Sequence, residues 1–294
     1  MRQMTGFAVV LSIAGVALLS GPAGAEAIEG ARNQESLKRA TETIQPELLP
    51  DGSRVWPDGT VVGSDGTIYF SVKGEAALRD SHVGSLAGRR DGETCVFELP
   101  ELRLEADQSS ILWRELMRDS GNCVVKYEVG VPEDGGKADG LSRDALDRPH
   151  ARSASSAGAR MRIWWEDIVN NSVSEVTAHV QTTVNWGSCV YSGSGWETHD
   201  WAETGWSMVS NSHWNGPRIG WCTDWASNNS QEHHNHTFCW PKNVHTHFPD
   251  TFVGIHVNGY AYGGNQYASY ISHHGWTWVP CFPLQRNAQL SWGS

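Results

Sequence analysis

Histidines spaced two residues apart are the pattern in this chain that most directly suggests metal chemistry. His234 and His236 form one pair, and His245 and His247 form another. Residues i and i+2 of a strand share one face, so each pair offers two imidazole nitrogens, which are common zinc ligands. Solvated or hydrogen-bonded histidines are the commoner outcome of such a pattern, and a zinc site is the alternative. No other cofactor is indicated, because the chain has no phosphate-binding loop or dinucleotide fingerprint.

Tryptophan is concentrated in the same part of the chain. Thirteen of the 15 Trp and 11 of the 13 His fall between Arg160 and Ser294. Buried rings would form the core of a sheet protein, whereas exposed rings would stack against sugar faces or other apolar ligands. Both roles can hold for different rings. Six tryptophans lie among small polar residues and are the candidate ligand-binding set: Trp196, Trp201, Trp206, Trp214, Trp221 and Trp225.

Acidic residues among these tryptophans are candidates for glycoside hydrolysis, which requires two carboxyl groups. Glu197, Asp200 and Glu203 have the best placement, and solvated loop acids are the simpler interpretation. No Gly-x-Ser-x-Gly elbow is present, and that motif is the usual signal for a serine hydrolase of the α/β type. The sequence therefore predicts no specific catalytic reaction.

Three functional hypotheses follow from these residues. The leading hypothesis is an extracellular protein that binds a glycan or cell-surface polymer through aromatic loops around residues 196–225. The second is a metal-dependent extracellular hydrolase that uses the histidine cluster. The third is a structural envelope or inhibitor protein.

The first 25 residues have the features of a secretory signal peptide. Arg2 gives a positive start, Phe7–Leu19 is an apolar run, and Ala23-Gly24-Ala25 is a small-residue cleavage pattern. A membrane span needs roughly 20 apolar residues, and neither this run nor any later one is long enough. We therefore expect cleavage after Ala25 and secretion, with no membrane span.

The net charge of −11 bears on the partners of the chain. Nucleic-acid binding needs clustered Lys and Arg to neutralise phosphates, and no basic cluster is present. A nucleic-acid partner is therefore not expected.

Six cysteines follow the signal peptide. In an exported protein this number favours disulfides over a reduced metal site. Sequence alone permits about 15 pairings. Proximity and strand context favour Cys95–Cys123, Cys189–Cys222 and Cys239–Cys281.

Residues 162–294 are predicted to form an antiparallel, Trp-rich β-sandwich, with a partly closed barrel as the alternative. Apolar and polar residues alternate through Val176–Trp186, which predicts a strand. Another strand is expected from Trp206 to Ser212. Phe252–Tyr262 and Gln266–His274 are expected to form a hairpin across the glycine-rich residues 263–265.

Residues 26–130 are predicted to form a small β-rich unit, joined to the sandwich by a linker over residues 131–161. Asp-Gly recurs every seven residues at positions 51, 58 and 65, and this pair favours tight turns over calcium ligation. Strands are expected at Cys95–Leu99 and Cys123–Val129. Ser109–Arg118 has the cap and spacing of a short helix, and Glu35–Thr43 is a second candidate helix.

Three segments carry a low-specificity resemblance to known proteins. They are Trp164–Val169, Gly187–Val190 and Phe238–Pro241. Together they give the C-terminal half a resemblance to uncharacterised secreted β-rich proteins of high-GC Gram-positive bacteria. The resemblance implies export and β-structure but no activity.

Overall fold

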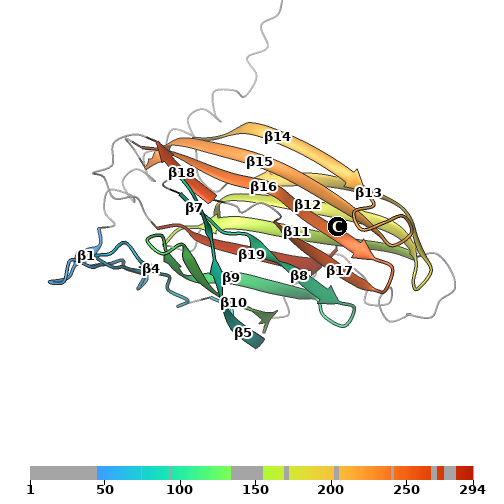
Figure 1. Cartoon of the computed structure of the whole chain (residues 1–294), viewed down its shortest axis with the longest axis horizontal. Helices are drawn as coiled ribbons and strands as arrows, with labels where there is room; N and C mark the ends of the chain where they lie inside the picture. The colour runs from blue at the N-terminus through green and yellow to red at the C-terminus, as the bar shows by residue number, and fades with distance from the viewer. Residues whose placement is uncertain are drawn as a thin grey trace, which may run out of the picture. The chain divides into compact units, whose positions relative to one another are not determined.

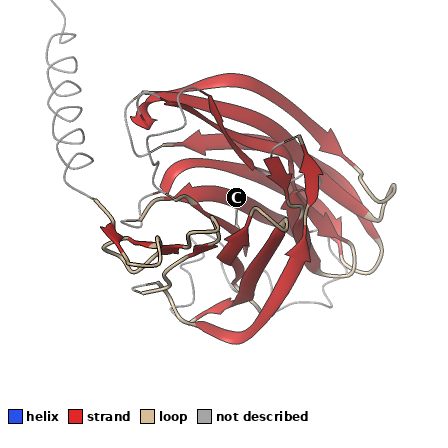
Figure 2. Ribbon diagram, turned by 60° about the vertical axis from the view of Figure 1, so that its left-hand side comes forward, coloured by secondary structure: helices blue, strands red, loops and turns tan. Residues whose placement is uncertain are grey.

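Strands are the only regular elements among the residues that the structure describes (Figures 1 and 2). The structure is a computed structural model. It describes residues 45–73, 75–92, 94–133, 155–168, 172–201, 205–239, 242–265, 270–274 and 283–293. The predicted signal peptide and the predicted helix Glu35–Thr43 lie outside these residues, as does Glu203.

The Asp-Gly repeat folds as a ladder of three equivalent turns. In each turn an aspartate accepts a hydrogen bond from the backbone N–H two residues later: Asp51 from Ser53, Asp58 from Thr60, and Asp65 from Thr67, all at 2.9 Å. The glycines have φ angles between 84° and 101°, which residues with a side chain rarely adopt. The aspartates therefore serve the turns, as predicted from the sequence. The turns connect β1 (Glu47–Leu48), β2 (Arg54–Val55), β3 (Val61–Val62) and β4 (Ile68–Tyr69).

This ladder continues into the larger of two main sheets, which has eleven described strands. After β4 the spatial order is β9, β19, β11, β12 and β13. On the side of β9 that does not pair with β4 and β19, β9 pairs with β10, and β10 in turn pairs with β5. The pairs are antiparallel. The additional strands are β5 (Leu78–Ala87), β9 (Ser110–Asp119), β10 (Val124–Pro132), β11 (Ser155–Glu166), β12 (Ser172–Asn185), β13 (Cys189–Asp200) and β19 (Gln285–Trp292).

The smaller main sheet has six described strands and faces part of the larger one (Figure 1). Its order is β14-β15-β16-β17-β8, with β18 paired to the other end of β16. A separate ribbon is formed by β6 (Arg89–Asp91) and β7 (Thr94–Val96). The strands of the smaller sheet are β8 (Leu99–Glu105), β14 (Trp206–Gly216), β15 (Asp224–Cys239), β16 (Lys242–His256), β17 (Tyr260–Asn265) and β18 (Tyr270–His274).

Apolar side chains from both main sheets fill the space between them. Leu104 and Val253 come from the smaller sheet, whereas Trp113, Ile163 and Leu290 come from the larger one, and all five are fully buried. Neither sheet closes into a barrel. The predicted mainly-β sandwich is therefore confirmed, and the barrel alternative is not formed.

The expected helix at Ser109–Arg118 is wrong, because Ser110–Asp119 is strand β9. Its backbone pairs with β10 on one side and with β19 and β4 on the other. The successive residues Trp113, Arg114 and Glu115 are all buried, although their side chains alternate between the two faces of the strand. A central strand is covered on both faces, so its apolar residues need not alternate with polar ones. The spacing of the apolar residues along this strand therefore resembled the spacing expected of a helix.

The expected hairpin turn at residues 263–265 is also wrong. The turn lies at Val257-Asn258-Gly259, where Gly259 has a φ of 88°, and β16 pairs with β17 across it. Gly263 lies inside β17, where a Cβ atom would lie 2.9 Å from the Phe252 carbonyl oxygen and 3.2 Å from Met161. Glycine at this position permits close packing of the two sheets.

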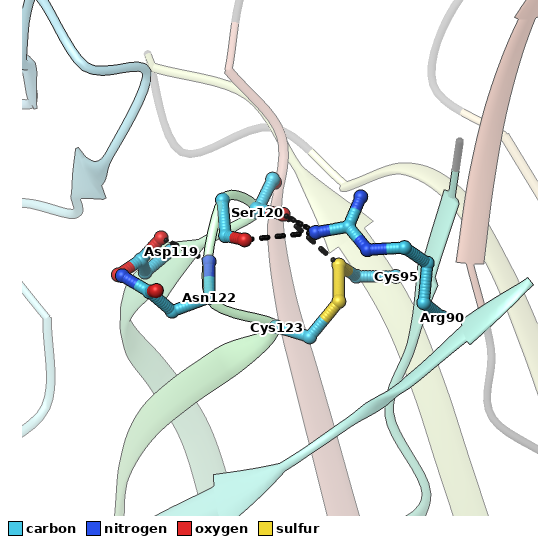
Figure 3. Close-up of a disulfide and its surroundings, with 7 residues drawn as sticks. Arg90, Cys95, Asp119, Ser120, Asn122 and Cys123 are labelled. Carbon is cyan, nitrogen blue, oxygen red and sulfur yellow. Dashed lines mark hydrogen bonds between the residues drawn. A yellow bond between two sulfur atoms is a disulfide. The ribbon is translucent and has the colours of Figure 1, made fainter. Parts of the chain in front are cut away.

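Two of the three predicted disulfides are confirmed. Cys95 bonds to Cys123 beside the turn that Arg90 stabilises by donating hydrogen bonds to the carbonyls of Ser120 and Gly121 (Figure 3). Cys189 bonds to Cys222. The third predicted pair includes Cys281, which lies outside the described residues.

Strands from both predicted units share the two main sheets. β9 pairs with β19, and β8 pairs with β17, and one compact unit extends from Ile44 to Ser294. At the predicted linker, β10 continues to Pro132 and β11 begins at Ser155. Residues 134–154 lie outside the described residues. No described segment forms a helix with the length and apolar character needed to cross a bilayer.

Candidate metal centre

Strand alternation places a carboxylate and several imidazoles on the outward face of the smaller sheet. On β15, His233 is buried in the interior, whereas Glu232 and His234 are partly exposed on the opposite face. On β16, Thr246 is buried between the partly exposed His245 and His247. The antiparallel register pairs Glu232 with His247 and His234 with His245.

Three of these side chains bring their donor atoms together. One ligand atom from each of Glu232, His245 and His247 lies within 4.8 Å of the other two. Glu232 Oε1 is 2.8 Å from His245 Nδ1, and Glu232 Oε2 is 3.9 Å from His247 Nδ1. Tetrahedral ligands of zinc lie about 3.4 Å apart when each bond is about 2.0–2.1 Å. A bound ion would therefore require the Glu232 and His245 donor atoms to separate slightly and the Glu232 and His247 donor atoms to approach each other.

The donor set suits a divalent transition metal. Two imidazole nitrogens and one carboxylate oxygen form a His₂Glu set, which occurs in catalytic zinc sites with a water in the fourth position. The side chains of Glu232, His245 and His247 are 27 %, 20 % and 17 % exposed. All three side chains are therefore partly exposed, as a site that exchanges an ion or a water with solvent requires.

Only part of the predicted set of four histidines therefore lies in this cluster. His245 and His247 belong to the cluster, and the His234 ring centroid lies 4.3 Å from that of His245. The side chain of His236 lies outside what the structure describes. Glu232 was not among the metal candidates of the sequence analysis, although its two-residue separation from His234 in a strand indicates that the two share a face.

His233, directly between two outward residues, has a different environment. Its side chain is fully buried, with Nδ1 2.9 Å from Ser174 Oγ and Nε2 2.9 Å from Gln231 Oε1. Ser174 Oγ is also 2.8 Å from Thr246 Oγ1. Burial lowers the pKa of His233 to about 4, with a further contribution from His199. His233 is therefore a neutral core residue of the sheet that carries the candidate metal centre.

The six candidate tryptophans do not share one environment. Trp206 is buried, and Trp201 and Trp225 pack against the core. Trp196 stacks on His179 with ring centroids 5.0 Å apart. Trp214 and Trp221 are 48 % and 73 % exposed. Only these last two expose a large ring surface to an external ligand.

The predicted acidic candidates are separated from the metal cluster. Glu197 lies in β13, an edge strand of the larger sheet. Its Oε2 is 2.9 Å from His213 Nδ1, and its Oε1 accepts a 3.0 Å hydrogen bond from Asn211. Asp200 is exposed and accepts a hydrogen bond from the backbone N–H of Trp201. The Glu197–His213 pair joins residues 16 positions apart and was not predicted from the sequence.

Comparisons with known proteins give no match: none with a family model, none with a curated protein and none with a solved structure. The resemblance to secreted bacterial β-rich proteins therefore stays a prediction.

Proposed function

We propose that this protein binds a divalent transition-metal ion, zinc in the first place, outside the cytoplasm. The observation that carries the proposal is the convergence of Glu232, His245 and His247 within 4.8 Å. Extracellular placement is supported by the two disulfides, because such bonds persist in oxidising compartments, and by the signal-like first 25 residues.

The chemistry that such a site serves best is hydrolysis. Zinc held by three protein ligands lowers the pKa of a bound water to about 7 and so supplies hydroxide near neutral pH. The Glu232 carboxylate offsets part of the ionic charge. Glu232 Oε1 lies 2.8 Å from His245 Nδ1. Only a neutral imidazole ligates a metal, so protonation of the histidines competes with the ion and metal affinity falls as the medium becomes acidic.

Zinc binding is expected to depend on the two histidines of β16. Protein dialysed against EDTA should bind about one zinc ion per chain in isothermal titration calorimetry, with the stoichiometry checked by elemental analysis. The His245→Ala/His247→Ala variant should bind at least about 100-fold more weakly, because loss of one supporting contact alone typically costs 10–100-fold. Zinc-dependent hydrolysis of 4-nitrophenyl acetate, abolished by EDTA, would assign the hydrolytic role.

The matched control is His82→Ala, at an exposed position of β5. It should bind zinc like the parent protein. The proposal fails if the parent binds no zinc, or if the double variant and the control bind it equally well.

Binding of a glycan or cell-surface polymer is a second candidate function, now supported by one exposed loop. Trp221 and Ile219 project from residues 217–223 and are 73 % and 59 % exposed. The Asp224 carboxylate accepts hydrogen bonds from the backbone N–H groups of Arg218, Ile219 and Gly220, and Cys222 is tied to Cys189. The loop is therefore held in place, and it presents the Trp221 ring without a large ordering cost on binding.

Trp221→Ala is expected to weaken retention on a polysaccharide affinity column about 2- to 10-fold, which corresponds to the roughly 0.5–1.5 kcal/mol that an aromatic contact contributes. The far-UV circular dichroism spectrum should not change, because the ring is exposed. Tyr69→Ala, which removes an exposed ring from β4, is the control and should leave retention unchanged. Equal retention of parent and Trp221→Ala on every column would argue against this role. Trp206→Ala is unsuitable because that ring is buried.

A further inference from the structure

Strand β14 ends the smaller sheet and is exposed on both of its faces. Among the described strands it pairs only with β15, and Figure 1 shows it as the outermost strand of that sheet. Its residues 209–215 are all exposed, whether they face inward or outward. On the facing sheet β13 lies over β15 instead, so close that a Cβ atom at Gly195 would lie 2.5 Å from the Ser227 side chain. The free edge of β14 therefore extends past the interior of the sandwich.

The composition of β14 leaves this edge open to pairing. An exposed edge can pair with another strand, and proteins usually prevent this with charged residues, Pro or bulges. The other edge strands of seven or more described residues carry such residues: Pro100 and Arg103 in β8, Arg79 and Asp80 in β5, and Glu197 and Asp200 in β13. Trp206–Gly216 contains no Lys, Arg, Asp, Glu or Pro. Its bulge lies near one end, between Met208 and Ser210, so Ser210–Gly216 is free to extend the sheet.

We propose that β14 pairs with β14 of a second copy of this chain, so that the two smaller sheets become one continuous sheet across a two-fold axis. Charge argues for this occupant. Two chains that each carry a net charge of −11 repel each other over most of their surfaces, whereas β14 brings no carboxylate to the contact. Two-fold dimers are the commonest protein oligomers. A two-fold axis perpendicular to the sheet makes the paired strands antiparallel, which satisfies the backbone N–H and C=O groups of the free edge.

The symmetry restricts the register of this pair. Side chains of directly opposite residues lie on the same face of an antiparallel sheet, so one residue must lie opposite its own copy on the axis. Ser212 is in the middle of the run of exposed residues. Asn211 then lies opposite His213 of the second copy, and Ser210 lies opposite Trp214. Hydroxyl, amide and imidazole groups both donate and accept hydrogen bonds, so these pairs are self-complementary, and the Trp214 ring, 48 % exposed, gains a packing surface.

Analytical ultracentrifugation of EDTA-treated protein between about 1 and 100 µM measures the association. The proposal expects a reversible monomer–dimer equilibrium within this range, because the interface of a single strand pair is small. EDTA removes any ion that could bridge two chains, so the dimer should also persist in His245→Ala/His247→Ala. A protein that stays monomeric throughout this range overturns the proposal.

Ser212→Lys is the diagnostic variant. It places two ammonium groups opposite each other on the axis, and like charges that meet in an interface oppose binding. The dissociation constant of the dimer should rise at least about tenfold, while the far-UV circular dichroism spectrum stays unchanged because Ser212 is exposed. Ser85→Lys makes the same substitution at an exposed serine of the edge strand β5. This matched control should dimerise like the parent, and equal dimerisation of the two variants would contradict pairing through β14.

Cysteine cross-linking tests the register separately. Opposite residues of an antiparallel pair have Cα atoms about 4.5–5.5 Å apart, a separation that a disulfide spans. Ser212→Cys should therefore form disulfide-linked dimers in oxidised glutathione, as seen on non-reducing gels. Ser207→Cys, also exposed on β14 but five residues from the axis, places its two thiols about 30 Å apart and should stay monomeric on the gel, like the parent. If Ser212→Cys does not cross-link, or if Ser207→Cys cross-links as fast, the proposed pairing is wrong.

Discussion

Glu115→Ala is expected to lower the free energy of unfolding by about 3–5 kcal/mol, the usual cost of removing one partner from a buried ionic network. Glu115 and Arg286 are each 1 % exposed. The Glu115 carboxylate accepts hydrogen bonds from the Arg118 guanidinium at 2.8 and 2.5 Å and from the Arg286 backbone N–H at 3.2 Å. Burial lowers the pKa of Arg286 to about 10, and the nearby Glu115 opposes this shift.

The large cost arises because the arginines remain charged. Without Glu115, the Arg286 guanidinium keeps its 2.9 Å hydrogen bond to the Phe97 carbonyl but loses the buried negative charge beside it. Urea denaturation at pH 7 measures the change. Glu105→Ala is the control, since its ion pair with Arg103 is about half exposed and such pairs contribute at most about 1 kcal/mol. If Glu115→Ala and Glu105→Ala lowered the free energy of unfolding equally, burial of the Glu115 ion pair would not explain its contribution to stability.

Acidification from pH 6.5 to 4 is expected to remove about 3 kcal/mol of stability through His233, at about 1.36 kcal/mol per pKa unit. The folded-state pKa of His233 is about 4, below its ordinary value of 6.5. Between these two values the unfolded chain binds a proton that the folded chain does not. The contribution is therefore fully present above pH 6.5 and is lost as the pH falls through 4.

Urea denaturation at half-unit pH steps measures this loss. In His233→Asn the slope of unfolding free energy against pH should be smaller over the same interval, whatever the stability of that variant at pH 7.5. His82→Asn, at an exposed position, should retain the parent slope. An unchanged slope in His233→Asn would show that His233 does not govern the acid response.

The sequence predicted those elements in which local chemistry and burial agree. Buried Val180, Thr182 and Val184 alternate with exposed residues along β12, so a period of two indicated the strand. The Asp-Gly turns are likewise determined by contacts two residues apart. β9 was mistaken for a helix because it is covered on both faces by segments far away in the sequence, and no local pattern contains that information.

In the candidate metal centre, too, only the features set by local spacing were predicted from the sequence. The two-residue spacing of His245 and His247 predicted a shared face, and the structure confirms that both side chains point outward. Their proximity to Glu232 depends on the β15–β16 register, which the sequence does not reveal. The Glu197–His213 contact depends on how the edges of two different sheets meet, and it was therefore beyond prediction from spacing.

The position of β19 has a consequence for how the chain reaches its native state. This strand, Gln285–Trp292, lies between β9 and β11, yet it comes after both of them, and after every other described strand, in the sequence. Until it arrives, two long strands expose unpaired backbone edges, which favour association with other chains. The larger sheet can therefore be completed only after Gln285–Trp292 has been synthesised, and chains truncated before this strand would be prone to aggregate.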